Sequence, residues 1–206
     1  SEQFKEPSEY HSFFQLLHQL QQHKALITCA NAATKYFPSD AQSYFILSMT
    51  NRLLRNEEAS FNALLTATKL MPCHIQWRQM LGVFYKERGE KEKALACFNE
   101  CIAQKPDFME AYWQRSNFIT ILSDSELNLL TAVVQTTEKT ASVENNKIFA
   151  AYSLFRHYDE INQPDLAFEF LSLGAQLKRK QLTFDINKEV TEHQLIAENF
   201  DDALLN

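Results

Sequence analysis

The chain has 206 residues, of which 45% are apolar and 22% charged, so it is long enough to bury a core and is ordinary in composition for a globular protein. Three glycines and five prolines are too few for the many turns of a β-sandwich or an α/β domain, which favours helices joined by tight turns. The net charge of −6 argues against wholesale nucleic-acid binding, which needs a basic surface.

An internal repeat is visible in the prolines. Pro38, Pro72 and Pro106 recur at equal intervals (72 − 38 = 34 and 106 − 72 = 34). The same period recurs in a tyrosine column, a small-residue column and a large apolar column: Tyr10, Tyr44 and Tyr112; Ala33, Ala67 and Cys101; Phe13, Leu47 and Leu81. A fixed period of this size predicts a solenoid of supersecondary units.

Each unit is expected to form two helices, and the third unit shows this best. Its first apolar stripe recurs at helical spacing in Trp77, Leu81, Phe84 and Tyr85. Gly89 then breaks the pattern as a C-terminal glycine would. The second stripe contains Ala94, Leu95, Phe98, Cys101 and Ile102. Because neither helix can bury its stripe alone, stacked units must share one core.

The third unit resembles the tetratricopeptide repeat. The residues that carry this resemblance are Leu81-Gly82, Tyr85, Gly89, Ala94, Phe98 and Pro106. One departure is Trp77, which lies one residue earlier than the family's usual aromatic, where this chain has Arg78. The resemblance implies an all-α, right-handed superhelical solenoid.

The repeat extends over most of the chain and predicts a single domain over residues 1–206, with about five helix pairs and a C-terminal capping helix. The expected units are residues 7–40, 41–74, 75–108, 109–142 and 148–181, followed by a capping or connector helix in 182–206. The fourth unit is degenerate because Arg115 and Ser116 replace the Leu-Gly pair. The polar stretch Thr136–Asn146 is expected to be a loop.

The stretch Ala167–Glu189 is similar to the end of the repeat region in bacterial tetratricopeptide-repeat sulfotransferases. That family holds a nucleotide donor with a glycine-containing phosphate loop. The glycines here, Gly82, Gly89 and Gly174, all belong to helix columns. The resemblance therefore implies the N-terminal repeat region of a larger sulfotransferase whose catalytic domain lies beyond this chain.

The default binding surface of such a solenoid is the concave face formed by the first helix of each pair. The repeat register places on it His11, Gln15, Phe45, Met49, Arg52, Gln79, Lys86, Trp113 and Asn117. Phe45, Met49 and Trp113 are expected to anchor a peptide or partner helix, and Arg52 and Lys86 to contact its carboxylates. The alternative is that these residues pack locally or are only solvated. The Lys-Asn-Arg set with which some family members grip a C-terminal carboxylate is not supplied by His11, Gln15 and Phe45.

Other candidate sites have simpler explanations. Cys97 and Cys101 are four residues apart, but no His or Cys pair follows at zinc spacing, so we expect core cysteines, no metal and no cofactor. Cys73 and His74 lie in a turn between units, and adjacent side chains seldom point at each other, so no catalytic pair is expected there. Lys178, Arg179 and Lys180 are expected to close the last unit's second helix.

We therefore expect a non-catalytic scaffold that binds a protein or peptide, with the sulfotransferase region as the alternative. No segment approaches the roughly 20 apolar residues that span a bilayer, and residues 1–8 lack the apolar centre of a signal peptide. We expect no nucleic-acid or membrane partner, and we expect a cytoplasmic location. The sequence leaves self-association open.

Overall fold

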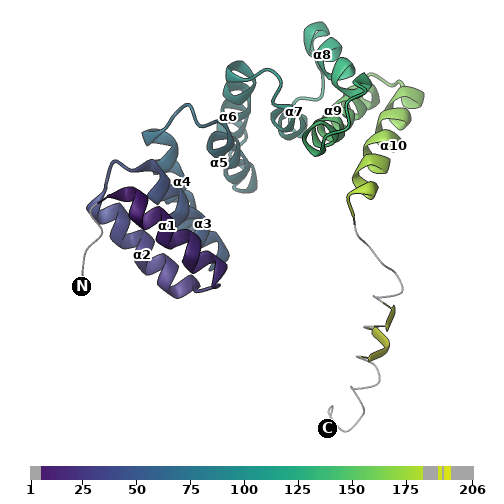
Figure 1. Cartoon of the computed structure of the whole chain (residues 1–206). Helices are drawn as coiled ribbons and strands as arrows, with labels where there is room; N and C mark the ends of the chain where they lie inside the picture. Colours follow the sequence, from purple (N-terminus) through teal and green to yellow (C-terminus); the bar gives the residue numbers. More distant parts are fainter. Residues whose placement is uncertain (1–5, 183–189, 192, 196–206) are drawn as a thin grey trace, which may run out of the picture.

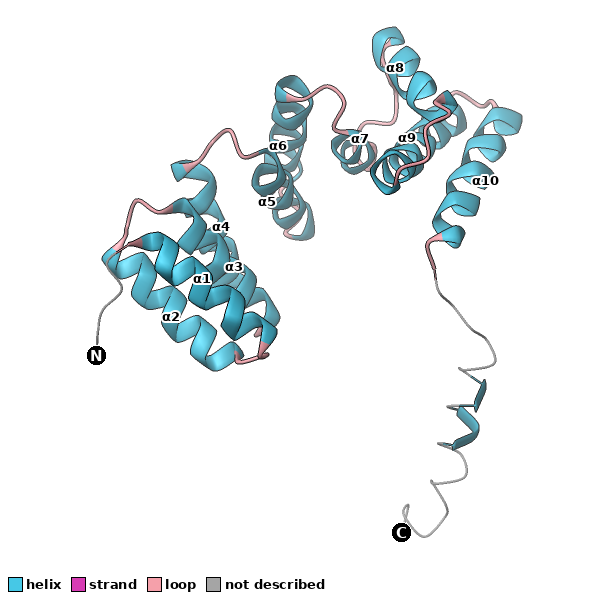
Figure 2. Cartoon of the chain, in the orientation of Figure 1, coloured by secondary structure: helices cyan, strands magenta, loops and turns pink. Residues whose placement is uncertain are grey.

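The computed structural model describes residues 6–182, 190–191 and 193–195, and this part of the chain contains helices, turns and loops but no strand (Figure 2). The all-α prediction is therefore confirmed. The helices are α1 (Pro7–Gln19), α2 (His23–Tyr36), α3 (Ala41–Leu53), α4 (Glu57–Leu70), α5 (Ile75–Glu87), α6 (Lys91–Gln104), α7 (Met109–Arg115), α8 (Asp124–Gln135), α9 (Ala141–Glu160) and α10 (Pro164–Lys180).

The repeat of the sequence is also the repeat of the helices. The first residues of α1, α3, α5 and α7 follow one another at the interval of the prolines. The helices of a pair pack together in α1–α2, α3–α4, α5–α6 and α9–α10, and successive pairs meet through α2–α3, α4–α5 and α6–α7. The chain thus follows an open arch from one pair to the next (Figure 1).

Small side chains allow the paired helices to approach closely. Ala33, Ala67 and Cys101, the small-residue column, are fully buried. A Cβ atom on Gly82 would lie 2.6 Å from Cε1 of Phe98, so glycine is needed where α5 crosses α6. Between units, Phe61 of α4 makes an edge contact with Tyr85 of α5, with ring centroids 5.4 Å apart. Stacking therefore produces the shared core that the repeat pattern predicts.

Each of four helix pairs turns through a residue with a left-handed backbone. These residues are Gln21 (φ 53°), Arg55 (φ 60°), Gly89 (φ 74°) and Asn162 (φ 56°). Gln21, Arg55 and Gly89 recur at the period of the repeat, so the same turn is made with different side chains. Only glycine adopts this conformation without steric cost, so Gln21 and Arg55 are strained at this position.

The fourth unit departs from the others, as the replacement of its Leu-Gly pair predicts. Helix α7 has only seven residues, and both α7 and α8 pack against α9. Arg115 occupies the position that Leu81 has in the third unit, and it reaches Glu126 of α8 across 2.7 Å. The backbone N–H of Leu122 donates to Nδ1 of His157, which fixes the connection between α7 and α8 on α9.

Two expectations for the second half need comment. The predicted loop Thr136–Asn146 is wrong in its second part, because α9 begins at Ala141. The cause is Thr140, whose side chain accepts a hydrogen bond from the N–H of Val143 and so caps the helix. Of the expected capping helix in 182–206, only Leu182 and residues 190–191 and 193–195 are described, and those after Leu182 are helical. The rest of that expectation lies outside the described residues.

Candidate functional site

The first helices of successive pairs touch one another and so form one continuous surface, here called the first-helix face. It consists of the exposed sides of α1, α3, α5, α7 and α9. Phe45 of α3 stacks on Trp77 of α5, with ring centroids 4.8 Å apart. Trp113 of α7 lies 5.2 Å from Tyr152 of α9. In Figure 1, α7 and α9 lie on the inner side of the arch and α8 on its outer side.

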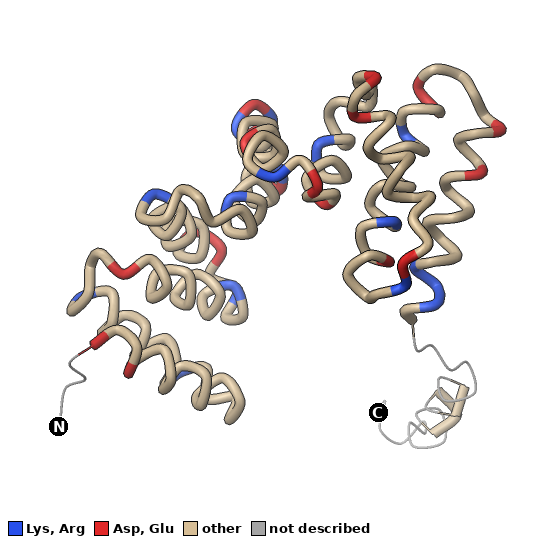
Figure 3. Tube along the Cα trace, turned by 45° about the horizontal axis from the view of Figure 1, so that its top comes forward, with Lys and Arg blue, Asp and Glu red and all other residues tan. Residues whose placement is uncertain are grey.

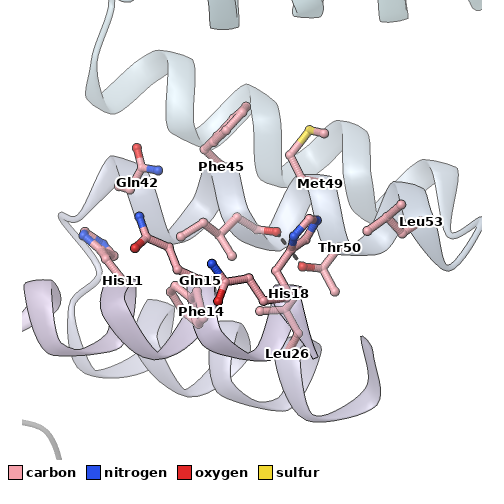
Figure 4. A pocket seen from close by; sticks show the side chains of 12 residues that line it. His11, Phe14, Gln15, His18, Leu26, Gln42, Phe45, Met49, Thr50 and Leu53 are labelled. Atoms are coloured by element: carbon pink, nitrogen blue, oxygen red, sulfur yellow. Dashed lines mark hydrogen bonds between the residues drawn. The ribbon is translucent and has the colours of Figure 1, made fainter. Parts of the chain in front are cut away.

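One hollow on this face lies between α1 and α3 and has a volume of about 660 Å³. Its apolar lining comes from Phe14, Leu26, Phe45, Ile46, Met49 and Leu53. Its polar lining comes from His11, Gln15, His18, Gln19, Gln42 and Thr50. Figure 4 shows the α1 and α3 side chains facing each other across the hollow. The described lining includes no Lys, Arg, Asp or Glu, so the hollow suits an apolar group with amide or hydroxyl contacts at its edge.

The polar edge of this hollow is held in place. Nε2 of His11 lies 2.9 Å from Oδ2 of Asp40, which also accepts from the N–H of Ser43 as the cap of α3. Burial alone would raise the pKa of Asp40, but the hydrogen bonds from Ser43 and His11 lower it. Asp40 therefore remains an anion that orients His11 at the end of the hollow.

Two of the expected anchors, Phe45 and Met49, line the hollow, but they differ in availability. The ring of Phe45 lies between the hollow and Trp77 and stacks on the Trp77 ring. Trp77 also stacks on the ring of His74, with ring centroids 4.0 Å apart. Phe45 thus packs locally, as the alternative interpretation expected, while one side still lines the hollow. Met49 lines the hollow without such a stack and is the more available apolar contact.

A second hollow of about 660 Å³ adjoins the first at Leu53, which lines both. Its charged lining comes from Arg52, Arg55, Arg88, Glu57 and Glu87. Arg52 lies 4.8 Å above the ring of Phe84 and 3.5 Å from Glu87, an exposed pair that contributes little stability. Arg52 therefore lines the second hollow, which carries both charges, whereas Met49 lines the adjacent first hollow.

Gln79 and Lys86 connect α5 to α7. The amide of Gln79 is buried and donates to Glu110 across 2.9 Å, and Nζ of Lys86 donates to Oε1 of Gln114 across 2.7 Å. Burial raises the pKa of the Glu110 carboxyl, and the bond from Gln79 partly opposes this. Gln79 is therefore a structural link, whereas the amine of Lys86 bonds to a neutral amide.

Trp113 and Asn117 have different roles. The side-chain amide of Asn117 donates to the carbonyls of Trp113 and Gln114, so it closes the end of its own helix. The ring of Trp113 lies against Tyr152 and beneath the guanidinium of Arg156, whose carbon is 5.4 Å from the ring centroid. The nine residues expected on the concave face therefore do not line a single cavity.

Sequence reasoning missed Tyr152 and Arg156, which extend the same face onto α9. Tyr152 follows Trp113 at an interval longer than the repeat period, because the fifth unit is displaced. The signal that could have found them is the equal offset from Leu81 to Leu154 and from Ala94 to Ala167. Aligning the third and fifth units by that offset places α9 in the register of α5.

The cysteines and Cys73-His74 are placed as follows. Cys97 and Cys101 are buried, and burial raises the pKa of Cys97 to about 11 and that of Cys101 to about 12. Cys73 is exposed and lies in a turn between units, as expected. Nδ1 of His74 accepts from the N–H of Trp77 and caps α5. No cluster of three or more metal-binding side chains occurs in the described part of the chain.

Charges are distributed along the whole arch (Figure 3). Lys178, Arg179 and Lys180 lie in the last turn of α10, where cations are favoured by the helix dipole.

Among the described helices, none has the length and apolar character required to cross a bilayer.

Comparison with known proteins identifies the repeat. Residues 78–108 match the model of the family described as Tetratricopeptide repeat. No curated protein sequence matches the chain significantly.

Solved structures with the same fold are distant in sequence. MamA residues 41 to the end from Desulfovibrio magneticus RS-1 is 12% identical, with a TM-score of 0.62 over 86% of this chain and 98% of that one. YrrB, described as a TPR protein with an unusual peptide-binding site, is 15% identical, with a TM-score of 0.59 over 82% and 85%. A Podosopora anserina protein with nearly identical TPR-like repeats is 13% identical, with a TM-score of 0.58 over 88% and 100%. Nothing in these matches supports the sulfotransferase resemblance. The chain contains a tetratricopeptide repeat at residues 78–108 and has the fold of the tetratricopeptide-repeat solenoids.

Proposed function

We propose that the chain is a protein-interaction scaffold that holds an extended peptide or a partner helix on its first-helix face. The observation that carries this proposal is the hollow of about 660 Å³ between α1 and α3, with apolar walls and a polar edge of Gln, His and Thr side chains. Apolar walls with a few placed polar groups are typical of sites that bind a side chain of a partner. The description of YrrB as a TPR protein with a peptide-binding site supports the same class of ligand.

The proposal gives the hollow a specific role. Met49 and Leu53 would contact one or two apolar side chains of the partner, while Gln15 and Gln42 would bind its backbone amides. Because the second hollow begins at Leu53, a longer segment would continue past Arg52. The ligand is therefore expected to run along the arch and across successive first helices.

Two variants test the site with a random peptide library whose members carry blocked ends, panned against the whole chain. Met49→Glu places a charge in the hollow and is expected to weaken binding of the enriched peptides by at least about tenfold. Met71→Glu makes the same change at the exposed end of α4 and is expected to leave binding unchanged. Equal binding by both variants would show that the hollow is not the site.

A further inference from the structure

Arg156 is the least satisfied cation of the first-helix face. Its Nε is buried without a hydrogen-bond partner. Its recorded contact among the described residues is the ring of Trp113, with no carboxylate within ion-pair distance. The two Nη nitrogens are not fully buried and form no hydrogen bond within the described part of the chain, so they are the donors that a ligand can reach.

The unbonded Nη donors of Arg156 suit an external anion. Arg78 and Arg115 are also largely covered, and each of them has a carboxylate partner, Glu100 and Glu126. The guanidinium of Arg156 lies over the indole of Trp113, and its two Nη nitrogens can together form a bidentate bond to a carboxylate. Arg156 therefore has the arrangement of a cation that receives its anion from outside the chain.

The surroundings of Arg156 are held rigidly. Tyr152 lies between Trp113 and α10, where a Cβ atom on Gly174 would be 3.0 Å from its Cε1. The Tyr152 ring therefore packs closely against α10 at Gly174, where a larger residue would crowd it. A wall fixed in this way costs little entropy when a ligand binds.

A second cation lies on the other side of α7. Lys86 of α5 bonds to the neutral amide of Gln114, the neighbour of Trp113 in sequence. The carboxyl of Glu110, on the same helix, accepts a hydrogen bond from Gln79, and its single negative charge is less than the two positive charges of Lys86 and Arg156. In a chain with a net charge of −6, this local excess of positive charge is complementary to an acidic ligand.

We propose that the first-helix face at α7 and α9 binds acidic side chains of an extended partner peptide, with Arg156 on Trp113 as the principal contact and Lys86 as the second. The inference rests on the proposed function and specifies the chemistry of the partner. Side-chain carboxylates fit better than a single chain terminus, because the two cations flank α7 on opposite sides and the face continues beyond both.

The test uses the blocked-end random peptide library, panned against the whole chain and against its variants. Wild type is expected to enrich peptides that contain Asp or Glu. Arg156→Gln is expected to weaken their binding by about tenfold or more, and added salt to weaken wild-type binding. The matched control Arg179→Gln removes the same charge from the exposed end of α10 and is expected to bind as wild type does. Circular dichroism and thermal unfolding establish that the Arg156 variant remains folded.

Each other outcome contradicts the inference in a recognisable way. If the enriched peptides lack acidic residues, or bind the Arg156 variant as tightly as wild type, the acidic site is wrong. Loss of the same peptides on Met49→Glu would then show that the proposed function still holds. If wild type enriches no peptide, the proposed function fails, and the acidic site fails with it.

Discussion

Arg115 donates a hydrogen bond from Nη2 to Oε1 of Glu126 across 2.7 Å, and the two side chains are only 10% and 20% exposed. The pair joins α7 to α8, at the position where the third unit has Leu81. Glu126 also accepts from the N–H of Ser123 in the capping box of α8. The degenerate unit is therefore held together by an ion pair where its neighbour uses an apolar contact.

The first prediction concerns the free energy of unfolding when one partner of this pair is removed. Arg115→Leu should lower it by about 3–5 kcal/mol, because the Glu126 carboxylate is left covered without its cation. Adding Glu126→Gln should recover much of the loss, since the amide oxygen still accepts from Ser123 and no charge is left unpaired. Urea unfolding of the four chains of the double-mutant cycle measures this coupling, and additive effects would contradict it.

The second prediction follows from the pKa of Glu126. Burial alone would raise it, but hydrogen bonds from Ser123 and Arg115 together with the charge of Arg115 lower it. Because the native pKa lies below the unfolded value of about 4.3, the stabilisation is present above that pH and is lost as the pH falls through the native value. Wild type should therefore lose more stability on acidification than Glu126→Gln. Thermal unfolding at a series of acidic pH values checks this, and parallel curves for the two chains would contradict it.

Much of the fold could be predicted because the repeat constrains residues in several columns at once. Two columns recur at the interval that separates the starts of successive first helices. They are the buried small residues Ala33, Ala67 and Cys101 and the exposed prolines of the turns. The start of α9 could not be placed from the same period, because the fifth unit is displaced and Thr140 supplies an early cap. A local hydrogen bond decided where that helix begins.

The candidate site was predictable as a face but not as a set of contacts. The register places Phe45 and Trp113 on first helices, yet it cannot show that Phe45 stacks on Trp77 or that Arg156 covers Trp113. Both contacts join different units, and one crosses the displaced boundary. Stacking between side chains of different units depends on how neighbouring units are placed relative to each other. The spacing of residues within one unit gives no information about that placement.

The third prediction compares two phenylalanines at equivalent positions. Phe61 of α4 is 8% exposed and packs against Phe84 and Tyr85 of the next unit, whereas Phe168 of α10 is 70% exposed. Phe61→Ala should lower the free energy of unfolding by about 3–5 kcal/mol, and Phe168→Ala by less than about 1 kcal/mol. Urea unfolding of both variants tests this, and a large loss for Phe168→Ala would show that its ring is covered in solution.

The fourth prediction uses the left-handed turn that recurs between paired helices. Gly89 has a φ of 74° with no atom within 4 Å of an added Cβ, so Gly89→Ala meets only backbone strain and should cost about 1 kcal/mol. Arg55 has the same conformation, with a φ of 60°, so Arg55→Gly should relieve that strain. The greater freedom of glycine in the unfolded chain offsets part of the gain, and the net stabilisation should be below about 1 kcal/mol. The melting temperature should therefore fall for Gly89→Ala and rise for Arg55→Gly. A lower melting temperature for Arg55→Gly would mean that the side chain of Arg55, rather than its backbone, governs this turn.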